Sequence, residues 1–459
     1  MIFIDDMGYA DIGPFGADYP TPNLDRMAEG GMKFTQFLVS AAVCSASRAS
    51  LLSGCLNQRL GIPGAYSPKS PNGLNPDEIT LAELVKQSDY ATACIGKWHL
   101  GLHPKFLPAN QGFDYYFGLP YSNDMWPWHP RYHALAPDDP KRTEVYPPLP
   151  LVENTEVIDP EVTAEEQTML TTWYTEKAVQ FIEENRHKPF LVYLPHSMVH
   201  VPLFVSDKFK GKSGLGLYAD TVMELDWSLG QILDTLEKYQ LEKDTLVIFT
   251  SDNGPWASYG DHGGSADPLR GFKHTAWEGG LREPTLFWWP GKISPGAVCH
   301  EFASTIDIFP TVAKLLGADL PRHKIDGKDI SPLMFGQPGA ESPHQFFPHF
   351  HAGRLVAIRS GKWKLVFPHK YSALNGRPGG KDGLPVRYDQ NTAELALYNL
   401  EDDIGETTNI IDRHPEIYQT LLQTAQAYRD ELGDKSTGAV GTGVRPPGVM
   451  REGDLRLTW

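Results

Sequence analysis

Four residues with oxygen-bearing side chains stand directly after two apolar runs of the chain. Asp5 and Asp6 follow MIFI, and Asp252 and Asn253 follow VIFTS. If both runs are buried strands of one open α/β sheet, these side chains lie at its carboxyl edge, where such sheets bind ligands. Carboxylate and amide oxygens suit Ca²⁺ or Mg²⁺ better than they suit thiolate-seeking metals. Taken alone, either pair is equally typical of a solvated turn.

Cys44 and Arg48 lie four residues apart in the segment VCSASRASLLSG. If Ser47 opens a helix that runs towards Gly54, Cys44 lies just before the helix N-terminus, where the dipole and the free N–H groups stabilise an anion. The planar guanidinium of Arg48 suits a sulfate or a phosphate. A cysteine among small residues is also typical of a buried core thiol.

Further basic side chains occur in three separate segments. Lys97 and His99 are two residues apart in GKWHLG, so on an extended segment they point the same way. His196 and His200 follow an apolar run in PHSMVHVPL, and Lys273 lies in RGFKHTAWEGG. Lysine and histidine side chains can bind an anion and transfer protons at it.

Strands alternate with helices along most of the chain that carries these residues. Apolar runs predict strands at 1–6, 90–96, 189–196, 244–254 and 282–291. Helical spacing predicts helices at 21–31, 80–88, 161–185, 217–239 and 304–317, the first two capped by Thr21 and Thr80. This alternation predicts an α/β fold with a large mixed, mostly parallel sheet sandwiched by helices.

The pattern changes near residue 346. Amphipathic strand-like runs LVAIRSGKWKLVF and ELALYNLEDD are followed by the amphipathic helical run PEIYQTLLQTAQAYRDEL. We therefore predict two domains, residues 1–345 and residues 346–459, the second a smaller α+β domain with a four-stranded antiparallel sheet. The Gly-, Thr- and Pro-rich tail at 433–447 is expected to be loose or to wrap the surface.

Composition excludes several functions. The chain has 41 Lys plus Arg against 57 Asp plus Glu, a net charge of −16, which argues against a nucleic-acid partner. It contains no apolar run of about 18 residues, so no membrane span is predicted. Its four cysteines form no CxxC pair and are too sparse for a disulfide scaffold, so they leave the compartment open.

The chain resembles the formylglycine-dependent type I sulfatases, the arylsulfatase-like members of the alkaline-phosphatase-like superfamily. The resemblance rests on CxAxR followed by xxLxxG at Cys44, and on DDMGYADIG, TPNLDRMAEGGMKF, GKWHLG, GFDYYFG, SDNG, LRGFKHTAWEGGLREP and LYNLEDDIGETTNI. It implies an alkaline-phosphatase-like fold. The implied activity is that of a sulfuric ester hydrolase that cleaves the S–O bond of a sulfated sugar or polysaccharide.

The resemblance also implies that Cys44 is oxidised to formylglycine by a formylglycine-generating or sulfatase-maturating enzyme. As its hydrate, this group carries two hydroxyls on one carbon, so that one attacks sulfur and the other later expels sulfate. Ala46 departs from the family pattern, which more often has proline there, and maturation enzymes differ in accepting alanine. Conversion of Cys44 therefore depends on the host.

Roles for the other residues follow from the same resemblance. Asp5, Asp6, Asp252 and Asn253 are the expected ligands of Ca²⁺, with Mg²⁺ the second choice. Lys97 is expected to bridge nucleophile and sulfuryl oxygen, and His99 to act as the base on the second hydroxyl. His196 and His274 are interpreted as structural. The expected catalytic residues are Cys44, Arg48, Lys97, His99, His200 and Lys273.

Substrate contacts are expected mainly in the segment YSNDMWPWHPRYH at 121–133. Ser122 matches a sulfate-contact position of the family, aromatic faces suit sugar rings, and Arg131 suits an acidic or second sulfated group. A packed, Pro-rich loop is the alternative interpretation. The candidate substrate-binding residues are Ser122, Asn123, Trp126, Trp128, Arg131 and His262, with Trp256, His351 and Arg354 as further candidates.

Two other functions stay open. A phosphate or phosphonate ester hydrolase of the same superfamily shares the fold, although a single set of metal carboxylates favours the singly charged sulfate ester. A non-catalytic glycan-binding protein results if Cys44 stays a thiol. The resemblance implies a periplasmic or secreted protein, whereas this chain shows no signal peptide.

Overall fold

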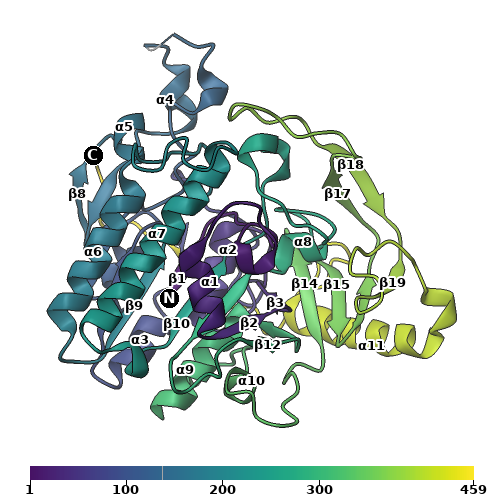
Figure 1. Cartoon of the computed structure of the whole chain (residues 1–459). Helices are drawn as coiled ribbons and strands as arrows, with labels where there is room; N and C mark the ends of the chain where they lie inside the picture. The colour runs from purple at the N-terminus through teal and green to yellow at the C-terminus, as the bar shows by residue number, and fades with distance from the viewer. Residues whose placement is uncertain (137) are drawn as a thin grey trace.

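The computed structural model describes every residue of the chain except residue 137. A ten-stranded sheet lies at its centre (Figure 1), with strand order β12-β2-β11-β10-β1-β9-β5-β6-β7-β8. The strands are β1 (Ile2–Ile4), β2 (Met32–Phe34), β5 (Ala91–Ile95), β6 (Tyr115–Gly118), β7 (Leu151–Glu153), β8 (Glu156–Asp159), β9 (Phe190–Pro195), β10 (Val247–Ser251), β11 (Thr285–Trp288) and β12 (Ala297–Cys299). The strands from β10 to β6 are parallel, whereas β11 and β7 run antiparallel to their neighbours.

Helices flank this sheet in two groups (Figure 1). One group packs α1 (Pro22–Glu29), α6 (Leu170–Asn185) and α7 (Leu217–Lys238) together, and the other packs α2 (Cys44–Ser53), α3 (Leu81–Lys86) and α9 (Ile308–Leu316). Shorter helices are α4 (Lys141–Val145), α5 (Ala164–Gln167), α8 (Glu278–Leu281) and α10 (Ser331–Met334). The predicted α/β class, a large mixed sheet between helices, is confirmed.

Helix ends show where local sequence signals were sufficient. Thr80 caps α3 as predicted, in a reciprocal capping box with Glu83. Thr21 occupies the N-cap position of α1, but its hydroxyl accepts a hydrogen bond from the amide of Gly13 (2.8 Å) instead. The first-turn amides of α1 donate to Asp226 of α7, including that of Leu24 at 2.8 Å. A tertiary contact therefore caps this helix.

The C-terminal region forms a second sheet with strand order β14-β15-β16-β19, all antiparallel. Its strands are β14 (Phe347–His351), β15 (Arg354–Ser360), β16 (Trp363–Val366) and β19 (Ala396–Asn399), and α11 (Pro415–Leu432) packs against it. The predicted four-stranded antiparallel sheet with one helix is therefore confirmed. A hairpin of β17 (His369–Ala373) and β18 (Asp389–Ala393) extends from this sheet.

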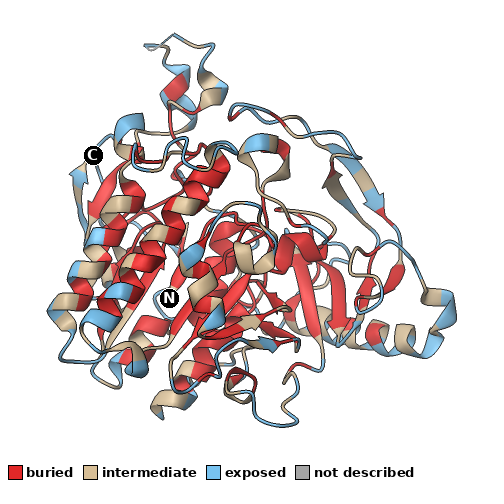
Figure 2. Cartoon of the chain, viewed as in Figure 1, coloured by how far each residue is buried: buried red, intermediate tan, exposed pale blue. Residues whose placement is uncertain are grey.

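Burial follows the two sheets (Figure 2). The strands of the central sheet are largely buried, whereas most residues of β17 and β18 are intermediate or exposed. The tail returns to the N-terminal part of the chain, where β20 (Gly448–Val449) pairs with β4 (Asn72–Gly73) and Arg445 contacts Glu78 at 2.6 Å. The remaining short strands, β3 (Phe37–Leu38) and β13 (Ala303–Ser304), pair with each other. In the described part of the chain, no helix combines the length and apolarity that a membrane span requires.

Candidate active site

Two adjacent parallel strands bring the four predicted oxygen ligands together. Ile4 of β1 lies opposite Ser251 of β10, so the residues that follow both strands emerge at the same edge of the sheet. Asp5, Asp6, Asp252 and Asn253 are all buried there. The amide of Asp6 donates to Asp252 Oδ1 (3.2 Å), and Asn253 Nδ2 donates to Asp6 Oδ1 (2.7 Å).

Each of the three buried carboxylates faces one buried cation. Lys97 Nζ pairs with Asp5, and Lys273 Nζ lies 2.7 Å from Asp6 Oδ1. Arg48 binds Asp252 through two nitrogens, Nε at 2.9 Å and Nη2 at 2.8 Å. These cations come from different segments of the chain, so the fold assembles a neutral set of charges in the core of an acidic protein.

The carboxylates respond differently to this environment. Burial raises the pKa of Asp6, and burial together with the negative charge of Asp5 raises the pKa of Asp252 to about 7. Burial also acts to raise the pKa of Asp5, but Lys97, His200 and Arg48 outweigh it and hold that pKa well below its usual range. The ionised forms of Asp6 and Asp252 are therefore disfavoured in this environment, and a bound cation would stabilise them.

The donor set fits a hard divalent cation. Asn253 Oδ1 is buried and has no hydrogen-bond partner among the described residues, although buried acceptors are nearly always satisfied. Potential ligand atoms of Asp5, Asp6, Cys44 and His200 lie within 4.8 Å of one another. Asp252 is outside that cluster, and its carboxylate is bound by Arg48. The oxygens of the two aspartates and of Asn253 are ligands that Ca²⁺ prefers.

Cys44 is the first residue of α2, not a residue before the helix. The prediction that Ser47 opens the helix is wrong, because the amide of Ser47 already donates to the carbonyl of Val43. Cys44 Sγ lies 3.6 Å from Asp5 Oδ1, and Arg48 follows one turn later. Burial raises the pKa of the Cys44 thiol well above its ordinary value. The unmodified side chain is therefore a neutral thiol and a weak nucleophile at neutral pH.

Lys97 and His99 follow β5 in a loop. The expectation of an extended segment is wrong at His99, whose φ of 61° lies in the left-handed region. Lys97 Nζ also donates to Ser122 Oγ at 3.1 Å. His99 Nε2 donates to the carbonyl of Tyr66 (2.8 Å), while Nδ1 is buried without a partner among the described residues. That nitrogen carries the free lone pair.

His99 is suited to act as a base. Burial and the charge of Lys97 lower its pKa well below the ordinary value, so the ring is neutral at neutral pH. The Tyr66 carbonyl fixes the tautomer and leaves Nδ1 as the proton acceptor. The sequence contained no signal for this contribution of Tyr66, because a backbone carbonyl can be supplied by any residue.

Lys273 and His200 form the other side of the site. His200 Nε2 accepts a hydrogen bond from Lys273 Nζ at 2.9 Å, and Nδ1 donates to the carbonyl of Val201 at 2.7 Å. Burial, and then Lys273, lower the pKa of His200 to about 3. The ammonium of Lys273 lies 4.2 Å from the ring centroid of Trp256, whose edge also contacts His200. Trp256 therefore covers both groups.

Two other histidines of these segments have different surroundings. His196 Nε2 lies 3.2 Å from Ser228 Oγ of α7, and its ring packs near Tyr174. His274 packs edge-on against Trp256, with its backbone amide bound to the carbonyl of Ala42. These contacts agree with the structural roles expected for both.

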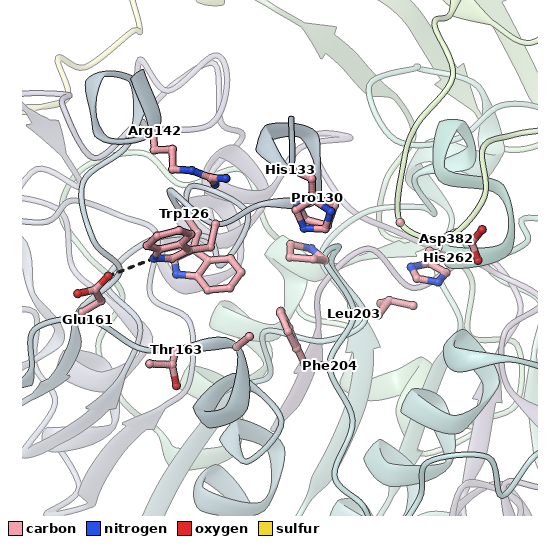
Figure 3. A pocket seen from close by; sticks show the side chains of 14 residues that line it. Trp126, Pro130, His133, Arg142, Glu161, Thr163, Leu203, Phe204, His262 and Asp382 are labelled. Atoms are coloured by element: carbon pink, nitrogen blue, oxygen red, sulfur yellow. Dashed lines mark hydrogen bonds between the residues drawn. The ribbon is translucent and has the colours of Figure 1, made fainter. Parts of the chain in front are cut away.

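The substrate-binding candidates divide into two sets. Ser122 contacts Lys97, and Asn123 Nδ2 donates to the carbonyl of Pro202 at 3.1 Å. Trp126, Trp128 and His262 line a cavity of about 720 Å³ (Figure 3), which we call the tryptophan cavity. Its wall is completed by Pro130 and His133 of the expected segment 121–133, and by residues that the sequence did not single out: Arg142, Glu161, Thr163, Ala164, Pro202, Leu203, Phe204, Asp382 and Gly383.

Arg131 is not part of that wall. Its Nε binds His129 Nδ1 (3.2 Å), and its Nη2 lies 3.8 Å from Asp124 Oδ2. His351 and Arg354 lie in the C-terminal sheet and also do not line the cavity. The substrate-contact roles expected for these three residues therefore stay predictions.

The chain matches known families over most of its length. Residues 1–318 match the family model described as Sulfatase, and residues 342–438 match the C-terminal region of aryl-sulfatase. Arylsulfatase A of Bos taurus is 37% identical over 440 residues, covering 93% of this chain and 85% of that protein.

Solved structures agree with these matches. The PsFucS1 sulfatase from Pseudoalteromonas sp. superposes with a TM-score of 0.84 at 27% identity, over 93% of this chain and 88% of that one. Ps i-CgsB in complex with k-i-k-neocarrahexaose gives a TM-score of 0.76 at 26% identity, over 93% and 91% of the two chains.

Proposed function

Because the chain belongs to the sulfatase family and is a sulfatase, we propose that it hydrolyses a sulfate ester of a carbohydrate with a formylglycine made from Cys44 and a bound Ca²⁺. The observation that carries the proposal is the position of Cys44, at the start of α2 and 3.6 Å from Asp5, a carboxylate that also pairs with the buried cations Lys97 and Arg48.

Modification of Cys44 would provide the nucleophile that the unmodified thiol does not. A buried thiol with a raised pKa cannot attack an ester efficiently. Hydrated formylglycine would supply a hydroxyl nucleophile at the same position. Arg48 and the free amides of the α2 N-terminus are placed to stabilise negative charge there. A maturation enzyme is the partner that this modification requires.

Asp5, Asp6, Asp252 and Asn253 would hold the cation. A bound Ca²⁺ would polarise a sulfuryl oxygen. The buried acceptor Asn253 Oδ1 and the raised pKa of Asp6 support this assignment. Ca²⁺ is favoured over Mg²⁺ because the ligands come from two separate strand ends and need not form an ideal octahedron.

The chain's own cations would bind the three sulfuryl oxygens. Lys97 pairs with Asp5 and Lys273 pairs with Asp6. A sulfuryl group bound between the two lysines would therefore contact two ammonium groups. His99 Nδ1 is available to remove a proton from the second hydroxyl of the hydrate, the one that later expels sulfate. The Lys273–His200 pair, linked by a 2.9 Å hydrogen bond, is placed to deliver a proton to the departing oxygen.

The number of acidic groups favours sulfate over phosphate monoesters. The described residues form one buried aspartate cluster of this kind, which suits one cation. A phosphate monoester carries a second negative charge and needs more positive charge to neutralise it. A carbohydrate substrate is supported by the aromatic lining of the tryptophan cavity and by the oligosaccharide bound to the similar Ps i-CgsB. Periplasmic or secreted localisation completes the proposal, because sulfated glycans are mainly extracellular.

The test combines chemical identity with turnover. Protein is first shown by peptide mass spectrometry to carry the aldehyde at Cys44, and is then supplied with Ca²⁺. Sulfate release is measured from 4-nitrophenyl sulfate and from a panel of sulfated monosaccharides, with matching phosphate and phosphonate esters beside them. Release from one sulfated regioisomer supports the proposal. Turnover of only phosphate or phosphonate esters overturns it in favour of the alternative hydrolase, and no turnover by aldehyde-bearing protein overturns it altogether.

A Cys44→Ala variant is the matched control for these assays. Alanine preserves the helix start of α2 but cannot be converted, so sulfate release should fall to background. Binding of the sulfated sugar without release in this variant would separate recognition from chemistry. Unchanged turnover in the variant would overturn the assignment of Cys44.

A further inference from the structure

The tryptophan cavity lies directly beside the charged site, because three segments run from one to the other. His200 contacts Lys273, and Pro202 to Phe204, which follow it, line the cavity. Ser122 contacts Lys97, and Trp126 lies four residues farther along. Trp256 covers Lys273, and His262 ends the same 3-10 helix segment inside the cavity. These short connections place the cavity within reach of the remaining part of a substrate whose sulfate lies between the lysines.

The wall of this cavity is mainly apolar and aromatic. Trp126, Pro130, Leu203 and Phe204 face its interior (Figure 3). The rings of Trp126 and Phe204 pack edge to face, with centroids 5.9 Å apart. Such faces bind flat apolar surfaces, including the C–H face of a sugar and an aryl group.

The arginine in the wall, Arg142, already donates hydrogen bonds to backbone carbonyls of the protein. Arg142 donates through Nε to Ala136 O (2.8 Å), through Nη1 to Pro127 O (3.2 Å) and through Nη2 to Leu135 O (2.6 Å). Its guanidinium also stacks 4.8 Å from the ring centroid of Trp128. A ligand anion would have to replace these buried hydrogen bonds, so Arg142 organises the wall and is not an open anion site.

Carboxylates stand at the edge of the cavity. Glu161 accepts a hydrogen bond from Trp128 Nε1 at 3.1 Å, and Asp382 reaches the cavity from the C-terminal domain. Asp382 is held there by its amide, which donates to Asp261 (3.1 Å). Both carboxylates are exposed, so their field is screened beyond about 8 Å but acts within the cavity. A second sulfate placed here would be repelled.

We propose that the tryptophan cavity binds the non-sulfated part of the substrate and selects a neutral ring with an apolar face over one that carries a second sulfate. The enzyme then acts on singly sulfated sugars joined to such a ring. This inference rests on the proposed function, which places the sulfate between Lys97 and Lys273. It replaces the expectation, drawn from Arg131, that a second acidic group is recognised.

The first experiment varies only the neutral ring. The sulfated monosaccharide that is turned over fastest in the panel is prepared as its phenyl and its methyl glycoside, and kcat/KM is measured for both. We expect the phenyl glycoside to be preferred about tenfold, the scale on which an apolar contact changes specificity. Trp128→Ala should abolish the preference and Trp128→Phe should restore part of it. Trp227→Ala, on α7 outside the cavity wall, is the matched control and should retain it.

The second experiment varies only the charge. The phenyl glycoside with a second sulfate on the phenyl ring should lose its sugar sulfate, followed separately from the aryl sulfate, with a kcat/KM several-fold below that of the singly sulfated form. The double variant Glu161→Gln and Asp382→Asn should narrow this difference, because it removes both charges at nearly constant size. Asparagine also tolerates the left-handed backbone of residue 382, where φ is 53°.

These outcomes separate the two proposals. Equal kcat/KM for phenyl and methyl glycosides, or preference for the disulfated form, overturns the cavity assignment while leaving sulfate hydrolysis intact. Absence of turnover on every sulfate ester, including 4-nitrophenyl sulfate, overturns the proposed function first.

Discussion

Replacing Asp252 with alanine tests the cation site most directly, because the carboxylate of Asp252 has two separable roles. It is a predicted ligand, and it is also the carboxylate that binds Arg48 through Nε and Nη2. Removing one partner of a buried ion pair costs about 3–5 kcal/mol. Asp5 remains 3.6 Å from Arg48 Nη2 and compensates in part, so we expect the lower end, about 3 kcal/mol, without metal.

Bound calcium should increase the free energy of unfolding of the wild type but not that of Asp252→Ala. A ligand at one hundred times its Kd stabilises the native state by about 2.7 kcal/mol. If Asp252 is a ligand, Asp252→Ala loses this increment as well, and the difference in free energy of unfolding grows to roughly 6 kcal/mol in Ca²⁺. The measurement is urea unfolding at pH 8, in EGTA and in Ca²⁺. That pH ionises Asp252, whose pKa burial raises to about 7.

Asp326→Ala is the matched control for this experiment. Asp326 binds Arg59 through two nitrogens, at 2.7 and 2.8 Å, and Arg59 keeps a second partner in Glu431. This variant should lose a similar free energy of unfolding in EGTA but keep the full calcium increment. A calcium increment in Asp252→Ala equal to that of the wild type would refute the ligand assignment.

Three further predictions follow from other contacts. His99→Ala should slow sulfate release about 10²–10⁴-fold and leave attack less affected, so mass spectrometry should detect a trapped sulfo-enzyme, and its absence would contradict the role of base. Burial lowers the pKa of His196 to about 3 from 6.5, so the unfolded chain binds the extra proton and stability falls as pH drops below 6.5. Between pH 7 and pH 5, the free energy of unfolding of His196→Gln should therefore fall by about 2 kcal/mol less than that of the wild type, as measured by denaturant unfolding. An equal fall in both proteins would exclude His196 as the cause. Lys364→Met removes the ammonium group that binds Glu278 at 3.0 Å and Glu406 at 2.8 Å. It should lower the free energy of unfolding by about 3–5 kcal/mol in the same assay. The exposed control Lys362→Met should change it little.

The fold and the charged site could be predicted largely from short segments. Apolar runs located β1, β5, β9 and β10, and polar residues at the ends of β1 and β10 indicated which edge of the sheet binds ligands. These signals are local, since a buried strand needs consecutive apolar residues and a ligand set needs particular residue types. The site's six basic and nucleophilic residues were also identifiable, because they lie in four short motifs, two of which hold two of them each.

Other features depended on contacts between distant segments. Asp226, far along the chain, determines the capping of α1, and the position of Cys44 in α2 follows from a backbone hydrogen bond. The partners of the site's cations were likewise invisible in the sequence, because each pair joins residues from different elements. The pairing therefore had to come from the assembled sheet.

The amino-acid sequence by itself determined the chemistry of this protein: which side chains can bind a cation, carry a nucleophile and transfer protons. Only the tertiary structure decided the environment in which they act. It buries the Cys44 thiol, leaves Nδ1 of His99 without a hydrogen-bond partner among the described residues, and binds Arg142 to backbone carbonyls. It also brings Asp382 of the C-terminal domain to the tryptophan cavity. The physical reason is that residue type sets what a group can do, whereas desolvation and neighbouring charges, which need the folded chain, set its protonation and its partners.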